Sequence, residues 1–431
     1  MGVVGCILGF LVVIYLCYKD WSVYVASIVG AAVVIAFNVL PFMDTLLDSY
    51  VNGMFVPIKS FFFLLLFGSI QSKIYSESGA AFAIADTIMS KLLRPGASNT
   101  KKNVIAVAVI VAIGIILCMG GINASVFIVL MYPVALTIFE YCDIPKRFIL
   151  GVLAAASYTF TLTMPGSPQV TNVAAMTALG TAADVALVPG LVGAAVEVVV
   201  IIVLMNIYIN KARAKGEHFE LHPLDPHYDK NTPRPNFWIA LFVSFNILKI
   251  NINICVIGST VLSILLFWKQ LKAKNLRELI STGAADSIHM SLTVAAICGF
   301  AGVVTNTEAF TTMLNAITSI NMSPMLICAV VVAVMCMLTG GSSTGQLISL
   351  PLIAPKLLDL GLNVNAIHRI ACFAATTLDS MPYSGAILML LPMCRMKLKE
   401  IYPPMFITTV IATTCGTIAV IVMCALFPGL C

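Results

Sequence analysis

Charge is scarce in this chain. Only 10% of the 431 residues are Asp, Glu, Lys or Arg, whereas 60% are apolar and the mean hydropathy is +1.01. A soluble globule of this length needs more polar surface, so the composition excludes one and predicts a polytopic membrane protein. The net charge of +5 is no sign of nucleic-acid binding, because the basic residues stand between apolar runs, where they report membrane topology.

Closely spaced cysteine pairs are absent, and the first apolar run lacks the features of a cleavable leader. The 13 cysteines lie in or beside apolar segments and no two are spaced as C-x-x-C, which favours free core thiols over disulfides or a metal site. The first apolar run, residues 3–18, has no basic leader and no clear cleavage site, so we expect a retained helix. We expect neither a cofactor nor a bound metal.

One pattern occurs twice, once in each half of the chain. Twin glycines begin at Gly120 and Gly340, and Met-Pro pairs begin at Met164 and Met381. In each copy the glycines separate two apolar arms, and the Pro/Gly-rich break interrupts the apolar run that follows. Such paired units indicate a transport site built from discontinuous helices.

The order of apolar runs predicts an all-α membrane protein with an inverted repeat, typical of elevator-type transporters. We expect about ten transmembrane helices, two re-entrant hairpins and two broken helices. The expected units are a first repeat at 1–210 with a hairpin at 103–142 and a broken helix at 147–185, a cytoplasmic linker at 211–235, and a second repeat at 236–431 with a hairpin at 324–361 and a broken helix at 365–394.

Basic residues set the expected orientation. With the linker in the cytoplasm, all but four of the 24 Lys and Arg lie inside or at the inner boundary, as the positive-inside rule requires. The first hairpin then enters from the cytoplasm and the second from outside, which makes the repeat inverted. The four outer residues are Lys59, Lys249, Lys356 and Arg369.

Several runs are too short or too polar to cross a bilayer of about 30 Å. The arms of the first hairpin, residues 104–117 and 126–139, have about 14 residues each, or about 21 Å of helix, which favours a re-entrant pair. Residues 44–53, 80–93 and 276–289 are amphipathic and are expected to be surface helices.

The hairpin tips and helix breaks hold the polar residues expected to bind substrate. Glycine lets a ligand approach the backbone, helix N-terminal N–H groups suit a carboxylate, and prolines free carbonyl groups. Packing through small residues and simple proline kinks are the structural alternatives. The expected binding residues are Gly120, Gly121, Asn123, Ser125, Thr163, Gly166, Ser167, Gln169, Gly340, Gly341, Ser342, Ser343, Thr344 and Ser380.

Asp379 is the outstanding charge, because it lies within the second break of an apolar segment. An acid at that depth is a functional candidate. Asp379 has three possible roles: proton carrier, sodium ligand or structural hydrogen-bonding group. We expect it to couple transport to a cation, with Na⁺ near Asn123 and Ser343 as the alternative to H⁺. Glu197 is the other acid in an apolar run and is either functional or structural.

Each of three further residues has two possible roles. His289 is a proton relay or an interfacial histidine. His368 and Arg369 attract an anion at the outer mouth or form a simple loop-boundary pair.

The run GGINASVFIVLMYPVALTIFEYCDIPKRFILGVLAAASYTFTLTMPGSPQVTN resembles the corresponding stretch of the gluconate permease (GntP) family, within the ion transporter superfamily. Weaker similarity extends over nearly the whole chain, and P-G-S-P-Q with the following asparagine is its most specific part. The resemblance implies a homodimeric secondary transporter of the bacterial inner membrane that couples H⁺ to a hydroxylated carboxylate. It implies a site formed by the tips around Asn123 and Ser343 and the breaks around Ser167 and Asp379.

The second break departs from the family pattern. It reads TTLDSMPYSGAI, where gluconate-type members carry an H-x-N-D-x-G-F-W-like motif, so a smaller or less hydroxylated acid is an alternative substrate. We expect H⁺-coupled symport of an anion such as gluconate, glycerate or a hydroxybutyrate, with Na⁺-coupled carboxylate symport as the alternative.

Two other classes fit less well. An anion channel needs a continuous polar stripe, and polarity is confined to the breaks. An enzyme needs a convergent nucleophile and base, and the nearest candidates, His222 and His227, stand in the Pro-rich linker. The expected partners are a small organic anion, H⁺ or Na⁺, the lipid bilayer and a second copy of the chain, with no nucleic acid.

Overall fold

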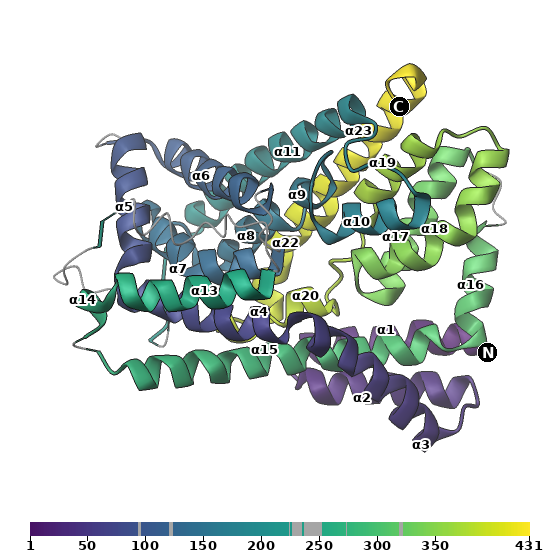
Figure 1. Cartoon of the computed structure of the whole chain (residues 1–431), viewed down its shortest axis with the longest axis horizontal. Coiled ribbons are helices and arrows are strands. Elements are labelled where there is room, and N and C mark those ends of the chain that lie inside the picture. The colour runs from purple at the N-terminus through teal and green to yellow at the C-terminus, as the bar shows by residue number, and fades with distance from the viewer. Residues whose placement is uncertain are drawn as a thin grey trace.

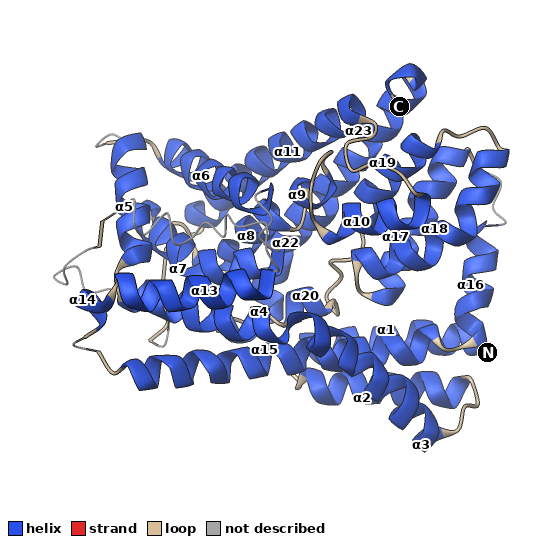
Figure 2. Cartoon of the chain, in the orientation of Figure 1, coloured by secondary structure: helices blue, strands red, loops and turns tan. Residues whose placement is uncertain are grey.

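Helices are the regular secondary structure in the part of the chain that the structure describes. The computed structural model describes all residues except 94–95, 120–123, 224, 226–234, 237–251, 273 and 319–321. It is 81% helix, and its described part contains no strand (Figure 2). The all-α prediction is therefore confirmed.

The helices of the first half run from the N-terminus to the linker. They are α1 (Gly2–Tyr18), α2 (Val23–Phe37), α3 (Phe42–Thr45), α4 (Val51–Glu77), α5 (Ala80–Leu92), α6 (Asn99–Met119), α7 (Ala124–Cys142), α8 (Ile149–Ser157), α9 (Phe160–Thr163), α10 (Val170–Leu179) and α11 (Leu187–Ala214).

The helices of the second half follow the linker in chain order. They are α13 (Ile252–Leu266), α14 (Trp268–Leu271), α15 (Leu276–Thr305), α16 (Glu308–Thr318), α17 (Pro324–Thr339), α18 (Ser342–Asp359), α19 (Val364–Ala375), α20 (Gly385–Leu388), α21 (Leu391–Cys394), α22 (Leu398–Phe406) and α23 (Ala412–Leu426). A π-helical turn, Ile407–Ile411, joins α22 to α23.

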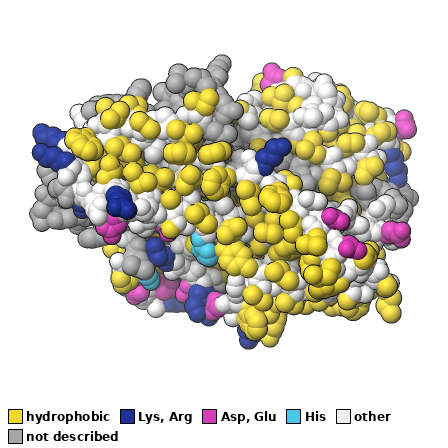
Figure 3. Space-filling model, turned by 60° about the horizontal axis from the view of Figure 1, so that its bottom comes forward, with side chains coloured by type: hydrophobic (Ala, Val, Ile, Leu, Met, Phe, Trp, Pro, Cys, Tyr) yellow, Lys and Arg dark blue, Asp and Glu magenta, His cyan; other side chains and the backbone are white. Residues whose placement is uncertain are grey.

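Five helical rods in the described part are long and apolar enough to cross a membrane: α6, α7, α11, α15 and the continuous rod from α22 to α23. Shorter apolar helices accompany them, among them α1, whose side chains Ile7, Leu11 and Tyr15 are 50%, 54% and 61% exposed. Residues four apart share one helix face, so this is an apolar stripe that suits lipid. Figure 3 shows a face on which such side chains dominate. The chain is a multi-pass membrane protein.

Three expectations about helix length are wrong. The arms of the first hairpin, α6 and α7, have 21 and 19 residues, because the polar residues at their ends continue the helices, so both are long enough to span. Residues 276–289 are not a separate surface helix but the first half of α15, which runs for 30 residues. Similarly, residues 46–50 form a π-helical turn that leads directly into α4. A helix is present where one was expected at 80–93, as α5, although six of its 13 residues are buried.

Helices α4 and α15 pack so closely that their backbones touch, and together they form what we call the helical wall. A Cβ on Gly53 would lie 2.5 Å from the carbonyl oxygen of Cys298, and one on Gly299 would lie 2.9 Å from that of Tyr50. Only glycine permits this approach. The wall forms a lower layer with α1, α2 and α13, and the hairpins and broken helices lie above it (Figure 1).

The upper layer has the same order of elements in each half. A hairpin (α6–α7), a broken helix (α8–α10) and a long helix (α11) are followed later by a hairpin (α17–α18), a broken helix (α19–α21) and a long rod (α22–α23). The two halves interlock, since α11 packs against α23 and α10 against α18. The repeat boundaries at residues 210 and 236 and the inverted orientation remain predictions.

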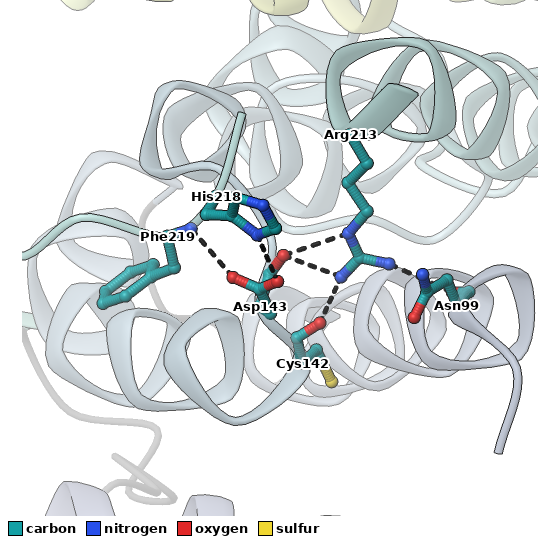
Figure 4. Close-up of polar contacts among 6 residues, drawn as sticks. All are labelled: Asn99, Cys142, Asp143, Arg213, His218 and Phe219. Carbon is teal, nitrogen blue, oxygen red and sulfur yellow. Dashed lines mark hydrogen bonds and ion pairs between the residues drawn. The ribbon is translucent and has the colours of Figure 1, made fainter. Parts of the chain in front are cut away.

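The described part of the linker is held against the turn between α7 and α8 (Figure 4). Arg213 donates from Nε and Nη2 to the backbone oxygen of Asp143 at 3.0 and 2.7 Å. The Asp143 carboxylate in turn accepts from the backbone N–H of Phe219 at 3.0 Å and lies 2.8 Å from Nδ1 of His218. The start of the linker is therefore part of the folded unit.

Asp143→Asn is expected to loosen this contact. Partial burial acts to raise the pKa of Asp143, but hydrogen bonds from the Phe219 amide and from His218 outweigh it and lower that pKa. The stabilisation is thus present above the usual carboxyl pKa of about 4 and is lost as the pH falls through the lower folded value. We expect trypsin to cut the variant at Lys215 about fivefold faster at pH 7, as loss of about 1 kcal/mol implies.

The matched control for this prediction is Glu220→Gln, because Glu220 is exposed in the same linker and makes no hydrogen bond or ion pair with the residues that the structure describes. Its cleavage rate should equal that of the wild type. Equal cleavage of the Asp143 variant and the wild type would show that this carboxylate does not hold the linker.

Candidate functional site

A cavity of about 190 Å³ lies where both hairpins and both broken helices meet the helical wall, and we call it the central cavity. The wall contributes mainly apolar side chains, among them Val56, Pro57 and Val294. The opposite side is polar. Its lining includes Ser125 on α7, Tyr158 after α8, the second tip from Thr339 to Thr344, and Asp379, Ser380 and Ser384 in the second break.

The structure brings only part of the predicted site together at this cavity. Gly120, Gly121 and Asn123 lie outside the described residues. Thr163, Gly166, Ser167 and Gln169 are described but do not line the cavity. The predicted residues that do line it are Ser125, Gly340, Gly341, Ser342, Ser343, Thr344, Asp379 and Ser380.

The residues of the first break brace the structure behind the cavity. Gln169 donates from Nε2 to the Cys118 carbonyl at 2.8 Å and accepts from the Ala124 N–H at 3.3 Å, so it ties the end of α6 to the start of α7. Ser167 donates to the Thr161 carbonyl at 2.5 Å. These side chains hold the flanks of the first tip in place.

Tyr158 is a cavity residue that the sequence did not single out. The chain breaks between α8 and α9 at Tyr158 and Thr159, before the expected break, and the Tyr158 hydroxyl lies 2.9 Å from Ser125 Oγ. The available signal was the alternation of hydroxyl residues at 157, 159 and 161. Each side-chain hydroxyl donates to the carbonyl four residues earlier, and this contact competes with the backbone hydrogen bonds of the helix.

The second tip and second break meet at Asp379. Ser380 Oγ donates to Asp379 Oδ1 at 2.9 Å, and no ion pair to this carboxylate occurs in the described part of the chain. Tyr383 donates to the Met337 carbonyl at 2.8 Å and so fastens the break to α17. Helix α18 begins at Ser342 beside the carboxylate, and Gly340 at φ +66° makes the tight turn before it.

The arrangement offers two opposite environments within one cavity. Hydroxyl groups and the N–H groups at the start of the 18-residue helix α18 favour an anion that carries hydroxyls. Asp379 favours a proton or another cation. A small anion in this cavity would therefore lie close to the Asp379 carboxylate.

Arg369 lies inside the protein rather than at an outer mouth. The residue is 0% exposed on α19. Its guanidinium donates to the carbonyls of Thr163 at 2.6 Å, Ala183 at 2.9 Å and Val185 at 2.8 Å. Neither interpretation of Arg369 drawn from the sequence holds. The carbonyls left free by the first break and by the loop after α10 occupy the guanidinium, and the residue lies within α19 rather than at a loop boundary.

His368 shares this buried position. Its Nε2 lies 2.8 Å from Asn172 Oδ1, and its Nδ1 lies 2.6 Å from Thr181 Oγ1. Asn172 also donates to the Ser167 carbonyl at 2.8 Å. His368 and Arg369 thus join the second broken helix to the first.

The other two candidates lie away from the central cavity. Glu197 on α11 is fully buried against α23, where a Cβ on Gly416 would lie 2.4 Å from its Oε1. His289 is exposed on α15, with Nδ1 2.9 Å from the Tyr24 hydroxyl. Neither lines the cavity, so neither contacts an anion bound there.

Membrane-crossing helices, paired hairpins and broken helices around a cavity that holds several polar groups define a membrane transport protein. Comparison with known proteins agrees and is more specific. Residues 1–261 match the model of the GntP family permeases, and the chain therefore belongs to this permease family. The resemblance seen in the sequence is confirmed.

Individual relatives are distant. The uncharacterized transporter YxjC of Bacillus subtilis (strain 168) is 24% identical over 430 residues, covering 87% of this chain and 88% of the relative. Among solved structures, the YdaH transporter of Alcanivorax borkumensis aligns with 90% of this chain and 89% of its own, at 13% identity and a TM-score of 0.41.

Proposed function

We propose that this permease is a secondary active transporter that carries a small hydroxylated organic acid anion together with a cation, H⁺ in the first instance. The observation that carries the proposal is the central cavity, where hydroxyls and a helix N-terminus lie beside the Asp379 carboxylate, which makes no ion pair in the described part of the chain. Gluconate, glycerate and hydroxybutyrate-type acids have the required chemistry.

The size and lining of the cavity support this substrate class. A volume of about 190 Å³ suits a small acid. Ser125, Ser343 and Thr344 offer groups that both donate and accept hydrogen bonds, as substrate hydroxyls require. The apolar side chains of the helical wall suit the carbon chain of such an acid.

Electrostatics supports cation coupling. Two negative charges about 4 Å apart repel by about 4 kcal/mol at an effective dielectric constant of about 20. A substrate carboxylate beside ionised Asp379 would meet this penalty, and a proton on Asp379 removes it. Sodium bound between the two carboxylates would do the same, so Na⁺-coupled carboxylate symport is the second candidate.

The proposed transport cycle moves the hairpins and broken helices against the helical wall. The cavity lies between these two groups of helices, so their relative movement would carry its contents across the membrane. A homodimer in the bacterial inner membrane, with the helical wall as the fixed part of each copy, completes the proposal.

Binding and uptake with purified protein test it. A thermal-shift screen with gluconate, glycerate, lactate, 3-hydroxybutyrate and D-serine should reveal at least one stabilising acid, because a ligand of the folded state raises its stability. In proteoliposomes, an imposed inward pH gradient should then drive uptake of that acid, and an imposed Na⁺ gradient should not. Uptake with Na⁺ alone would select the second candidate, and no accumulation under either gradient would refute symport.

Ser343→Ala is expected to weaken binding of the stabilising acid by about fivefold to tenfold, as loss of one hydrogen bond of about 1–1.5 kcal/mol implies. Isothermal titration with the purified protein measures this change. Ser349→Ala is the matched control, because Ser349 on the same helix donates to the Gly345 carbonyl at 2.7 Å and does not line the cavity. Unchanged affinity in the Ser343 variant would remove the second tip from the site.

A further inference from the structure

A second, smaller cavity of about 30 Å³ lies between the helical wall and the helices above it. Unlike the central cavity, it carries several charged groups. Its polar lining comprises Ser69, Ser72 and Lys73 on α4, Asp286 on α15, Tyr132 on α7, and Arg395 after α21.

This second cavity continues the central one. On three helices, a residue lining the second cavity lies four positions from a residue lining the central cavity, which is about one helical turn or about 6 Å. The pairs are Leu65 and Ser69 on α4, Ser125 and Val129 on α7, and Val294 and Met290 on α15. The two cavities are thus successive layers of the same seam.

The seam leads toward the basic end of the molecule. Beyond the second cavity, α15 begins at Leu276, directly after Lys272 and Lys274 and before Arg277. Clusters of this kind mark the cytoplasmic side of a membrane protein.

The second cavity has a surplus of positive charge. Lys73 Nζ pairs with Asp286 Oδ2 at 3.2 Å, so these two charges offset each other. Across the cavity, the Arg395 side chain makes no ion pair or hydrogen bond in the described part of the chain. Its backbone has φ +53°, a left-handed conformation that usually selects glycine, so a long cationic side chain at this point is unusual.

We propose that the second cavity is a transient binding site for the carboxylate of the transported anion, between the central cavity and the cytoplasmic face. Arg395 supplies the charge, and the Ser72 hydroxyl supplies a hydrogen-bonding group, whereas the Tyr132 hydroxyl donates to Asp225 Oδ1 at 3.4 Å. The proposal rests on the proposed function for the identity of the anion. The preference for negative charge is a property of the cavity itself and can be measured without a transported acid.

Thiol labelling in inside-out vesicles tests this preference. Ser72→Cys is labelled with the anionic sulfonatoethyl and the cationic trimethylammonioethyl methanethiosulfonates, and each rate is divided by that with free cysteine. The unsubstituted chain corrects for native thiols. We expect the corrected rate of the anionic reagent to exceed that of the cationic one by about tenfold, as one unpaired charge nearby implies.

Variants of Arg395 identify the source of the preference. Adding Arg395→Gln should abolish most of it, and Arg395→Lys should retain it. Lys399→Gln is the matched control, because Lys399 is an exposed cation that does not line the cavity, and it should leave the ratio unchanged. If Ser72→Cys does not fold, Ser69→Cys reports on the same cavity.

Two results would overturn the proposal: equal labelling by both reagents, or an anion preference that survives Arg395→Gln. The outcome is separable from that of the proposed function, because the reagents need not be transported. Failure of acid uptake with an intact labelling preference would refute symport alone. Acid uptake without the preference would refute the cytoplasmic site alone.

Discussion

Asp379→Asn is expected to abolish accumulation of the acid driven by a pH gradient, while exchange of internal for external acid continues. Asparagine keeps the shape and part of the hydrogen bonding of the side chain but cannot take up or release a proton. The neutral amide also removes the repulsion that an incoming carboxylate meets, so binding persists without a proton. Paired measurements of net uptake and counterflow in proteoliposomes separate the two activities.

Asp359→Asn is the matched control for this result, because Asp359 is an exposed acid at the end of α18 and lies outside the cavity. It should accumulate the acid like the wild type. Normal accumulation by the Asp379 variant would eliminate its coupling role. Loss of both accumulation and exchange, with the protein still folded, would assign Asp379 to substrate binding instead.

Arg369→Gln is expected to destabilise the protein more than any surface change, by about 3–5 kcal/mol. The guanidinium makes hydrogen bonds of 2.6 to 2.9 Å to three backbone carbonyls on two separate segments. Glutamine cannot reach all three, and a buried carbonyl left without a donor in a membrane protein is costly. Arg369→Lys should restore only part of the stability, because an ammonium group lacks the planar fork.

Thermal unfolding of the purified variants in detergent measures this loss. Arg277→Gln makes the same chemical change at an exposed position on α15 and should leave the unfolding temperature within error of the wild type. A wild-type unfolding temperature for Arg369→Gln would show that the three carbonyls find other donors.

The hairpins and breaks could be predicted from the sequence because glycine and proline act locally. Pro165 and Pro168 remove backbone donors wherever they stand, and Gly340 permits a left-handed turn. The repetition of these features in both halves gave the class of fold before any contact was known. Asp379 was identified for a similar reason, since an acid within an apolar run can be recognised from the sequence alone.

Features that depend on distant contacts could not be predicted in this way. The partners of Arg369 were missed because a count of charges along the chain does not show which groups a charge contacts, and its carbonyl partners are about 200 positions away in the chain. The opened helix at Pro165 frees carbonyls that need donors, and a search for a nearby cation would have suggested this arginine. The lengths of α6 and α15 were underestimated because polar residues end an apolar run without ending a helix.

A cryo-EM structure with the stabilising acid bound tests the central claim most directly. Density for the acid is predicted in the central cavity, with its carboxylate near the start of α18 and a hydroxyl within hydrogen-bond distance of Ser125 or Ser343. Acid bound at saturating concentration elsewhere in the protein, with the central cavity filled only by water, would contradict it.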